Sequence, residues 1–243
     1  MSSDKTRDHS IIVGGSSGIG RELVIHLSQT DNVSVMARRE DKLSELSKNN
    51  DNVFALTSDV SSTDSIRESL QASVEHYGKV DKLIYCAGKQ VVKPHRMADI
   101  KDFDSLYDVN LRGALFTSKL FCSAKVSEKT AVFCAISSIA AIRPEPGIVG
   151  YSVMKAALDS MIKGLAKEAG PRRFVGVAPG WLETEMTAAQ LVYGESFKQA
   201  LEKNSPLGLT SVKDVIDAID FLISRRAASI TGQILCVDSG SSL

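Results

Sequence analysis

This chain has no net charge that would indicate a partner, because its 243 residues include 29 lysines and arginines and 29 aspartates and glutamates. It also lacks a run of basic residues, which gives no reason to expect binding to nucleic acid. No apolar stretch approaches the roughly 20 residues that cross a membrane. The first ten residues, MSSDKTRDHS, lack the apolar segment of a secretory signal. We therefore expect a cytoplasmic protein without nucleic-acid or membrane partners.

Cysteine is scarce, and the four cysteines (Cys86, Cys122, Cys134 and Cys236) are scattered, with no C-x-x-C pair and no metal-ligand spacing. We expect reduced core residues and no metal site. Linkers, internal repeats and low-complexity segments are also absent. The length suits one well-buried α/β unit. Residues 1–243 are therefore expected to form a single domain, with residues 1–9 flexible.

The chain does contain a regular alternation of apolar runs and amphipathic segments. The expected strands are 10–13, 32–37, 53–56, 81–86, 131–136, 174–178 and 233–237, and the clearest expected helices are 62–77, 102–125, 151–168 and 211–224. This alternation predicts the α/β class, as a Rossmann-type, doubly wound domain with a seven-stranded, mostly parallel sheet. Ligands of such folds bind beyond the carboxyl ends of the strands.

The first expected strand runs into a glycine-rich turn, GGSSGIG at 14–20, and then into a helix. Glycines let the backbone approach a pyrophosphate, and the helix amino terminus offers free N–H groups and a positive dipole end. Glycine turns between strands and helices are common, but this strand–helix context favours a nucleotide. The expected cofactor contacts here are Gly14, Ser16, Ser17, Gly18, Ile19 and Gly20.

Two arginines follow the second expected strand. Dinucleotide folds that select NAD place a carboxylate near this point, but here none occurs before Glu40. Guanidinium groups pair well with phosphate, so Arg38 and Arg39 predict NADP(H), with Arg38 favoured. Alternatively, both arginines are solvated at the start of the next helix.

Other strand ends carry weaker signals. Asp59 could accept a hydrogen bond from the adenine amino group, or it could start the turn before the helix at 62–77. Ala87 and Gly88 could let the backbone approach a cofactor, or they could form an ordinary turn.

A tyrosine and a lysine four residues apart, Tyr151 and Lys155, share one face of the expected helix 151–168. A free tyrosine has a pKa of about 10. A neighbouring ammonium is expected to move that pKa toward neutrality, so that the phenol can exchange a proton. Ser138, after the strand 131–136, could hydrogen-bond the same substrate oxygen, with Ser137 as the alternative.

Together these motifs resemble those of the short-chain dehydrogenase/reductase (SDR) family, in its compact single-domain form, over essentially the whole chain. The resemblance is closest to members similar to 3-oxoacyl-acyl-carrier-protein reductases. It is carried by GGSSGIG at 14–20, CAG at 86–88, VNLRG at 109–113, Ser138, Tyr151-x-x-x-Lys155 and PGWLET at 179–184. The interval from Ser138 to Tyr151 is also usual for the family.

The resemblance implies a role for each matching residue. Tyr151 would donate a proton to the carbonyl oxygen in reduction, or accept one in oxidation. Lys155 would hold the nicotinamide ribose and favour the phenolate, and Ser138 would orient the carbonyl. The backbone of Asn110 would hold a water molecule of the proton relay. Further implied cofactor contacts are Asp59, Val60, Ala87, Gly88, Pro179, Gly180, Leu182 and Thr184.

Two positions depart from the family pattern. Val13 stands where relatives usually have threonine, and Cys86 stands where they have asparagine, so the usual polar link between these strand ends is lost. We hypothesise that the two side chains form an apolar contact instead. The segment before Pro179 also looks shorter than usual. PLGLTS lacks an arginine that many relatives carry, and VDSG replaces V-D-G-G, which weakens any inference about carrier-protein recognition or assembly.

The expected activity is NADPH-dependent reduction of a small-molecule carbonyl to a secondary alcohol, or the reverse. The alternatives are a 3-oxoacyl thioester reductase of fatty-acid or polyketide synthesis and, from another class, a non-catalytic NADP-binding regulator. Segments 89–97 and 186–206 would build the substrate pocket, into which His95, Leu191, Val192, Tyr193 and Phe197 could point, unless they pack a lid on the body. The resemblance also implies a homotetramer or homodimer, with helices 102–125 and 151–168 at an interface.

Overall fold

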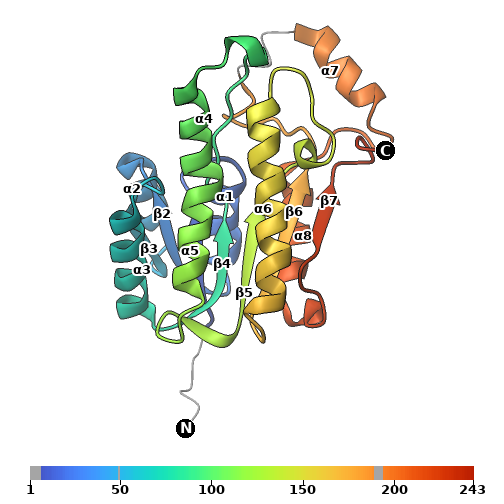
Figure 1. Cartoon of the computed structure of the whole chain (residues 1–243). Coiled ribbons are helices and arrows are strands. Elements are labelled where there is room, and N and C mark those ends of the chain that lie inside the picture. Colours follow the sequence, from blue (N-terminus) through green and yellow to red (C-terminus); the bar gives the residue numbers. More distant parts are fainter. Residues whose placement is uncertain (1–6, 49, 189–193) are drawn as a thin grey trace.

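One twisted parallel sheet organises the protein in the computed structural model, which describes residues 7–48, 50–188 and 194–243 (Figure 1). Its strands are β1 (His9–Val13), β2 (Asn32–Ala37), β3 (Val53–Thr57), β4 (Val80–Tyr85), β5 (Ser127–Ile136), β6 (Arg173–Pro179) and β7 (Ile234–Val237). They lie in the order β3-β2-β1-β4-β5-β6-β7, and every pairing is parallel. The predicted seven-stranded Rossmann-type fold is confirmed, and the sheet is wholly rather than mostly parallel.

Helices cover both faces of this sheet (Figure 1). They are α1 (Gly18–Leu27), α2 (Glu40–Lys48), α3 (Thr63–Tyr77), α4 (Ile100–Tyr107), α5 (Gly113–Phe121), α6 (Val149–Glu168), α7 (Gly194–Lys203) and α8 (Val212–Ile223). Short helical turns lie at His95–Met97, Asp108–Arg112, Ile139–Ala141 and Arg225–Ala227. Within the described ranges, no helix combines the length and the apolar character that crossing a membrane requires.

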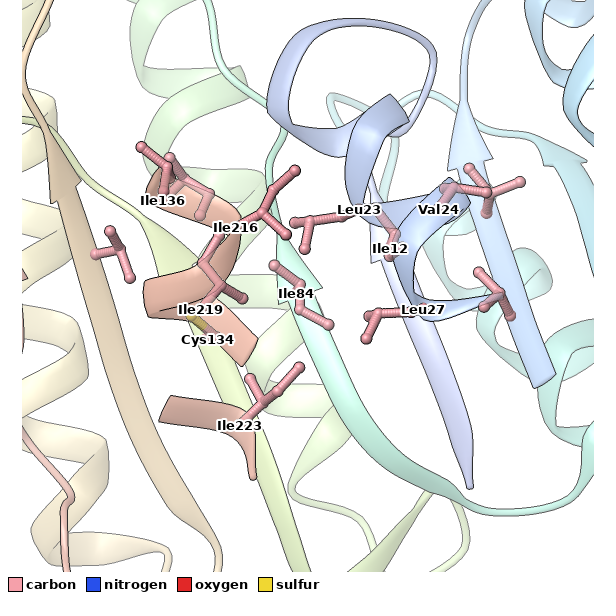
Figure 2. Packing of buried hydrophobic residues seen from close by; sticks show 14 of the residues in the cluster. Ile12, Leu23, Val24, Leu27, Ile84, Cys134, Ile136, Ile216, Ile219 and Ile223 are labelled. Atoms are coloured by element: carbon pink, nitrogen blue, oxygen red, sulfur yellow. The ribbon is translucent and has the colours of Figure 1, made fainter. Parts of the chain in front are cut away.

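The core forms two layers because a parallel sheet between helices must be apolar on both faces. On one face, Leu23 and Leu27 of α1 and Ile219 of α8 pack with Ile12 and Ile84 of the sheet (Figure 2). The opposite face is covered by α3, α5 and α6, whose buried residues include Ile66, Leu70, Ala114, Phe121, Leu158, Met161 and Ile162. Every strand between the two edges is therefore shielded from water on both sides.

The amino-terminal residues differ in part from their expected flexibility. His9 begins β1 and is fully buried. Its backbone N–H donates to Asp81 at 2.7 Å, and its ring nitrogens lie 2.8 Å from the Gly78 carbonyl oxygen and 2.9 Å from the Ser34 hydroxyl. The expectation of a flexible residue 9 is wrong because these contacts fix the start of the sheet, and residues 1–6 lie outside the described residues.

The expected continuous helix at 102–125 is interrupted. A π-helical turn at Asp108–Arg112 separates α4 from α5, and α5 ends at Phe121. The Val109 carbonyl in this turn accepts a hydrogen bond from the Tyr85 hydroxyl at 2.7 Å. Such turns insert one residue into a helix and are frequent at functional sites. Here the turn contains Asn110, which is fully buried.

The hypothesised apolar contact between Val13 and Cys86 is wrong. Val13 packs in the cluster beneath α3, α5 and α6, whereas Cys86 packs against the cluster beneath α1 and α8, on the other face of the sheet. The two strand ends are linked through the backbone instead, because the Cys86 N–H donates to the Val13 carbonyl at 2.7 Å. Neither side chain is needed for this link.

Gly113 opens α5 at a crowded point, where an added Cβ would lie 2.5 Å from the Tyr85 hydroxyl and 2.7 Å from the Val60 carbonyl oxygen. We expect Gly113→Ala to lower the free energy of unfolding by about 1–3 kcal/mol, because overpacking displaces the neighbours. Urea titration measures the effect. Gly164→Ala on α6, where a Cβ meets nothing within 4 Å, is the control and should be neutral or stabilising. Equal stability of the two variants would contradict this packing argument.

Candidate functional site

The carboxyl ends of the strands open into a cavity of about 1250 Å³. It lies beside β1, where the strand order reverses and where ligands of open α/β sheets bind. The predicted site residues that line it are Gly14, Ser16, Ser17, Gly18, Ile19, Gly20, Arg38, Arg39, Asp59, Val60, Ala87, Gly88, Ser138, Tyr151, Lys155, Pro179, Gly180, Leu182 and Thr184. Asn110 is the exception, because it lies behind the lining.

The glycine-rich turn lies directly against the turn after β4. Gly14 has a φ of 92°, and a Cβ there would lie 2.5 Å from the Ala87 nitrogen, so only glycine fits. Ser17 is the N-cap of α1, but its side chain makes no capping hydrogen bond to the helix. Ser17 therefore leaves the N–H groups of this first turn uncapped, as the predicted phosphate cradle requires.

Arg39 connects three segments at the rim of the cavity. Its Nε and Nη2 atoms donate to the Ser16 hydroxyl at 3.2 and 3.1 Å, and its Nη1 donates to the Glu185 carboxylate at 2.8 Å. Arg38 lines the same cavity. Both arginines are exposed next to the start of α2, which agrees with the alternative interpretation that they are solvated. Both also border the cavity in which the cofactor is predicted to bind.

Asp59 fits both interpretations given to it. It lines the cavity, and its Oδ1 accepts from the Ser61 N–H at 2.9 Å and from the Ser61 hydroxyl at 2.7 Å, which starts the turn before α3. Burial alone would raise the pKa of Asp59. The hydrogen bonds from Ser61 and the nearby charge of Arg38 outweigh burial, and the pKa is lowered. The carboxylate is thus ionised near the adenosine end of the predicted site.

Tyr151 and Lys155 lie one turn apart on α6, and they are only 7% and 4% exposed. Burial raises the pKa of Tyr151 to about 12, although a hydrogen bond with the Ser138 hydroxyl acts in the opposite direction. The expected lowering of this pKa by Lys155 is therefore not found. The Lys155 ammonium lies 5.6 Å from the Tyr151 ring centroid and donates to the Ile136 carbonyl at 2.7 Å.

Lys155 is itself strongly affected by its surroundings. Burial lowers the pKa of Lys155 to about 8, and the Asp159 carboxylate opposes that change. Asp159 lies one turn farther along α6 and was not among the predicted site residues, although its four-residue interval from Lys155 could have revealed it. Burial raises the pKa of Asp159 and the Ser137 hydroxyl lowers it, but Ser137 Oγ and Asp159 Oδ1 are both buried without a hydrogen-bond partner among the described residues, whereas the Ser138 hydroxyl meets Tyr151. The two serines thus face different residues.

The Asn110 side chain does not line the cavity but hydrogen-bonds the backbone of the cavity wall. Its Nδ2 donates to the carbonyl oxygens of Lys89, at 2.9 Å, and Leu106, at 3.0 Å, and its Oδ1 accepts from the Lys89 N–H at 3.1 Å. A Cβ on Gly88 would lie 3.3 Å from the same Oδ1 and 3.7 Å from Lys155 Nζ. The side chain therefore fixes the segment after β4 in place beside Lys155.

Both segments that were expected to build the substrate pocket contribute to the cavity lining, with Lys89, Gln90 and Val92 from 89–97 and Met186, Leu201 and Asn204 from 186–206. Arg143 also lines the cavity and is a residue that sequence reasoning did not single out. His95 instead lies beside the Phe103 ring, with centroids 5.8 Å apart, and does not line the cavity. Leu191, Val192 and Tyr193 and the side chain of Phe197 lie outside the described residues. In the sequence, the charged residues between Ser138 and Tyr151 could have identified Arg143 as a candidate site residue.

Known proteins resemble this chain throughout its length. A family model described as enoyl-(acyl carrier protein) reductase matches residues 13–242. The 3-oxoacyl-(acyl-carrier-protein) reductase FabG of Thermotoga maritima is 28% identical over 241 residues, which cover 95% of this chain and 96% of that protein.

Solved structures share the fold. A short-chain type dehydrogenase/reductase from Mycobacterium ulcerans superposes with a TM-score of 0.89 at 26% identity, over 97% of this chain and 90% of that one. A variant of actinorhodin polyketide ketoreductase, solved with NADPH, superposes with a TM-score of 0.92 at 25% identity, over 98% of each chain.

We expect Asp159→Asn to lower the pKa of Lys155 further below about 8, because the carboxylate one turn away favours the ammonium form. Titration of isotope-labelled lysine side chains by NMR measures this pKa, with the Lys155 signal assigned from Lys155→Met. Glu168→Gln, at the exposed end of the same helix, is the control and should leave the titration unchanged. A Lys155 pKa that stays the same in Asp159→Asn would rule out this coupling.

Proposed function

Because this chain belongs to the short-chain dehydrogenase/reductase family, we propose that it is an NADP(H)-dependent oxidoreductase that reduces a small-molecule carbonyl to a secondary alcohol. The observation that carries the proposal is the buried, protonated Tyr151 beside Ser138 and Lys155, at a cavity whose far rim holds Arg38 and Arg39. A proton donor and a nucleotide cradle in one cavity are what carbonyl reduction by a nicotinamide requires.

The residues at the cradle fit NADP(H), which supplies the hydride when it is bound. The close approach at Gly14 and the uncapped start of α1 suit a pyrophosphate. Arg38 and Arg39 suit a phosphate on the adenosine ribose, and residues 36–39 at the end of β2 include no carboxylate to select a free hydroxyl. The NADPH named with the actinorhodin ketoreductase structure supports the same cofactor.

Tyr151 would supply the proton. It holds its proton at neutral pH because burial raises its pKa to about 12. Reduction turns the substrate carbonyl oxygen into an alkoxide, which is far more basic than a phenolate, so the proton moves from the Tyr151 hydroxyl to that oxygen. Ser138, hydrogen-bonded to Tyr151, would orient the same oxygen. In the reverse direction Tyr151 would accept the proton of the alcohol.

Lys155 and Asn110 would replace the donated proton. Lys155 would hold the nicotinamide ribose hydroxyls, and its pKa of about 8 allows it to take up and release a proton near neutrality. The Asn110 side chain is already bonded to Lys89 and Leu106. A water molecule of the proton relay would therefore bind the Asn110 backbone carbonyl rather than its side chain.

A 3-oxoacyl thioester reductase is a second candidate, supported by the name of the Thermotoga maritima relative. A regulator that only binds NADP(H) is less well supported, because burial of an amine and a phenol side by side is costly and serves no purpose in binding alone. Assembly as a homodimer or homotetramer and a cytoplasmic location remain predictions.

We expect Tyr151→Phe to lower carbonyl turnover by about 100-fold or more, because the proton donor is lost, while NADPH binding stays within twofold of wild type. NADPH oxidation with a panel of ketones and 3-oxoacyl thioesters measures turnover, and fluorescence titration measures binding. Tyr107→Phe on α4, whose side chain is exposed, is the control and should keep full turnover. NADPH binding without turnover of any substrate by wild type would favour the regulator.

We expect wild type to bind NADPH more tightly than NADH, and Arg38→Ala to lose about tenfold in affinity for NADPH alone, because one charged partner of the phosphate is removed. Fluorescence titration with both nucleotides measures the two dissociation constants. Arg67→Ala, an exposed arginine on α3 that pairs with Asp64, should behave as wild type. Equal or tighter binding of NADH would overturn the cofactor proposal and direct the search to alcohol substrates.

A further inference from the structure

The Glu185 carboxylate lies among groups that an anionic ligand would use. Arg39 Nη1 donates to it at 2.8 Å. That hydrogen bond lowers the pKa of Glu185, and a hydrogen bond from Ser17 and the charge of Lys42 act in the same direction. These groups come from the start of α2 and the N-cap of α1. Glu185 itself belongs to the segment after β6, so its partners are distant in sequence.

The same donors border the predicted site of the ribose phosphate. Arg39 also holds the Ser16 hydroxyl, and Ser16, Ser17, Arg39 and Glu185 all line the cavity. A guanidinium, a hydroxyl and an ammonium form the kind of donor set that binds phosphate. Because the Glu185 carboxylate is itself an anion, its position shows where these donors bind a negative charge.

We infer that Glu185 is a specificity-determining residue whose carboxylate takes the place of the ribose phosphate of NADP(H) and competes with that phosphate for Arg39. The inference rests on the proposed cofactor. NADH carries no phosphate at this position and does not compete with Glu185. The carboxylate therefore weakens the binding of NADPH relative to NADH, although both arginines favour the phosphate.

The exposure of the Arg39–Glu185 ion pair limits how much the carboxylate can weaken NADPH binding. The side chains of Arg39 and Glu185 are 42% and 60% exposed, and exposed ion pairs are weak. The phosphate can therefore displace the carboxylate. Neighbouring residues tie this segment to the cavity, because Thr184 lies 3.8 Å from the position of a Cβ on Gly18 and Met186 lies 3.4 Å from that of a Cβ on Gly88.

The test is to titrate wild type, Glu185→Gln and Glu183→Gln with NADPH and NADH. Glu183 is exposed, lies two residues away and does not line the cavity, so it is a matched control for loss of one charge. We expect Glu185→Gln to tighten NADPH binding by about two- to fivefold, in line with loss of one exposed ion pair, and to leave NADH binding unchanged. The pair 2′-phospho-ADP-ribose and ADP-ribose should show the same difference, which would place it at the phosphate.

Further outcomes separate this inference from the proposed function. If wild type prefers NADPH but Glu185→Gln and Glu183→Gln have the same ratio of NADPH to NADH affinity, the inference is wrong and the proposed function stands. If wild type prefers NADH and only Glu185→Gln reverses that preference, the competition stands and the cofactor proposal is wrong. In an Arg39→Ala background, Glu185→Gln should have no effect, and a retained gain in NADPH affinity would also refute the competition.

Discussion

The position of β1 between β2 and β4 is the constraint on which the rest of this structure depends. Because both pairings are parallel, the turns after these three strands meet at one edge of the sheet. The turn at Gly14 then lies so close to the turn at Ala87 that no side chain fits between them. The cradle, the cavity and the buried tyrosine all lie at the end of the sheet that this arrangement creates.

Burial shifts the pKa values of Tyr151 and Lys155, one turn apart on α6, in opposite directions. It raises the pKa of Tyr151 and lowers the pKa of Lys155 to about 8, so burial shifts each group toward its neutral form, although Lys155 is still mostly protonated at pH 7. The Ile136 carbonyl and the Asp159 carboxylate partly restore the charge on Lys155. A protonated phenol next to an amine with a lowered pKa is a consequence of one helix packed against the ends of the strands.

The rim of the cavity behaves differently because it is exposed to water. There, Arg39 joins the glycine-rich turn to the segment after β6 through Ser16 and Glu185. Water screens such contacts, so they are weak and can be exchanged for a ligand. Selectivity between two similar nucleotides needs only modest differences in free energy, and an exposed ion pair can supply them.

The sequence by itself determined the strands, the parallel sheet and most residues that line the cavity, because apolar runs, glycine turns and the Tyr151–Lys155 interval are local patterns. It did not determine the π-helical turn around Asn110, the opposite faces of Val13 and Cys86, or the partners of Asp159 and Glu185. Only the tertiary structure decided these features, because each depends on which distant segments pack together. Burial also set the pKa of Tyr151, which local spacing alone predicted in the wrong direction.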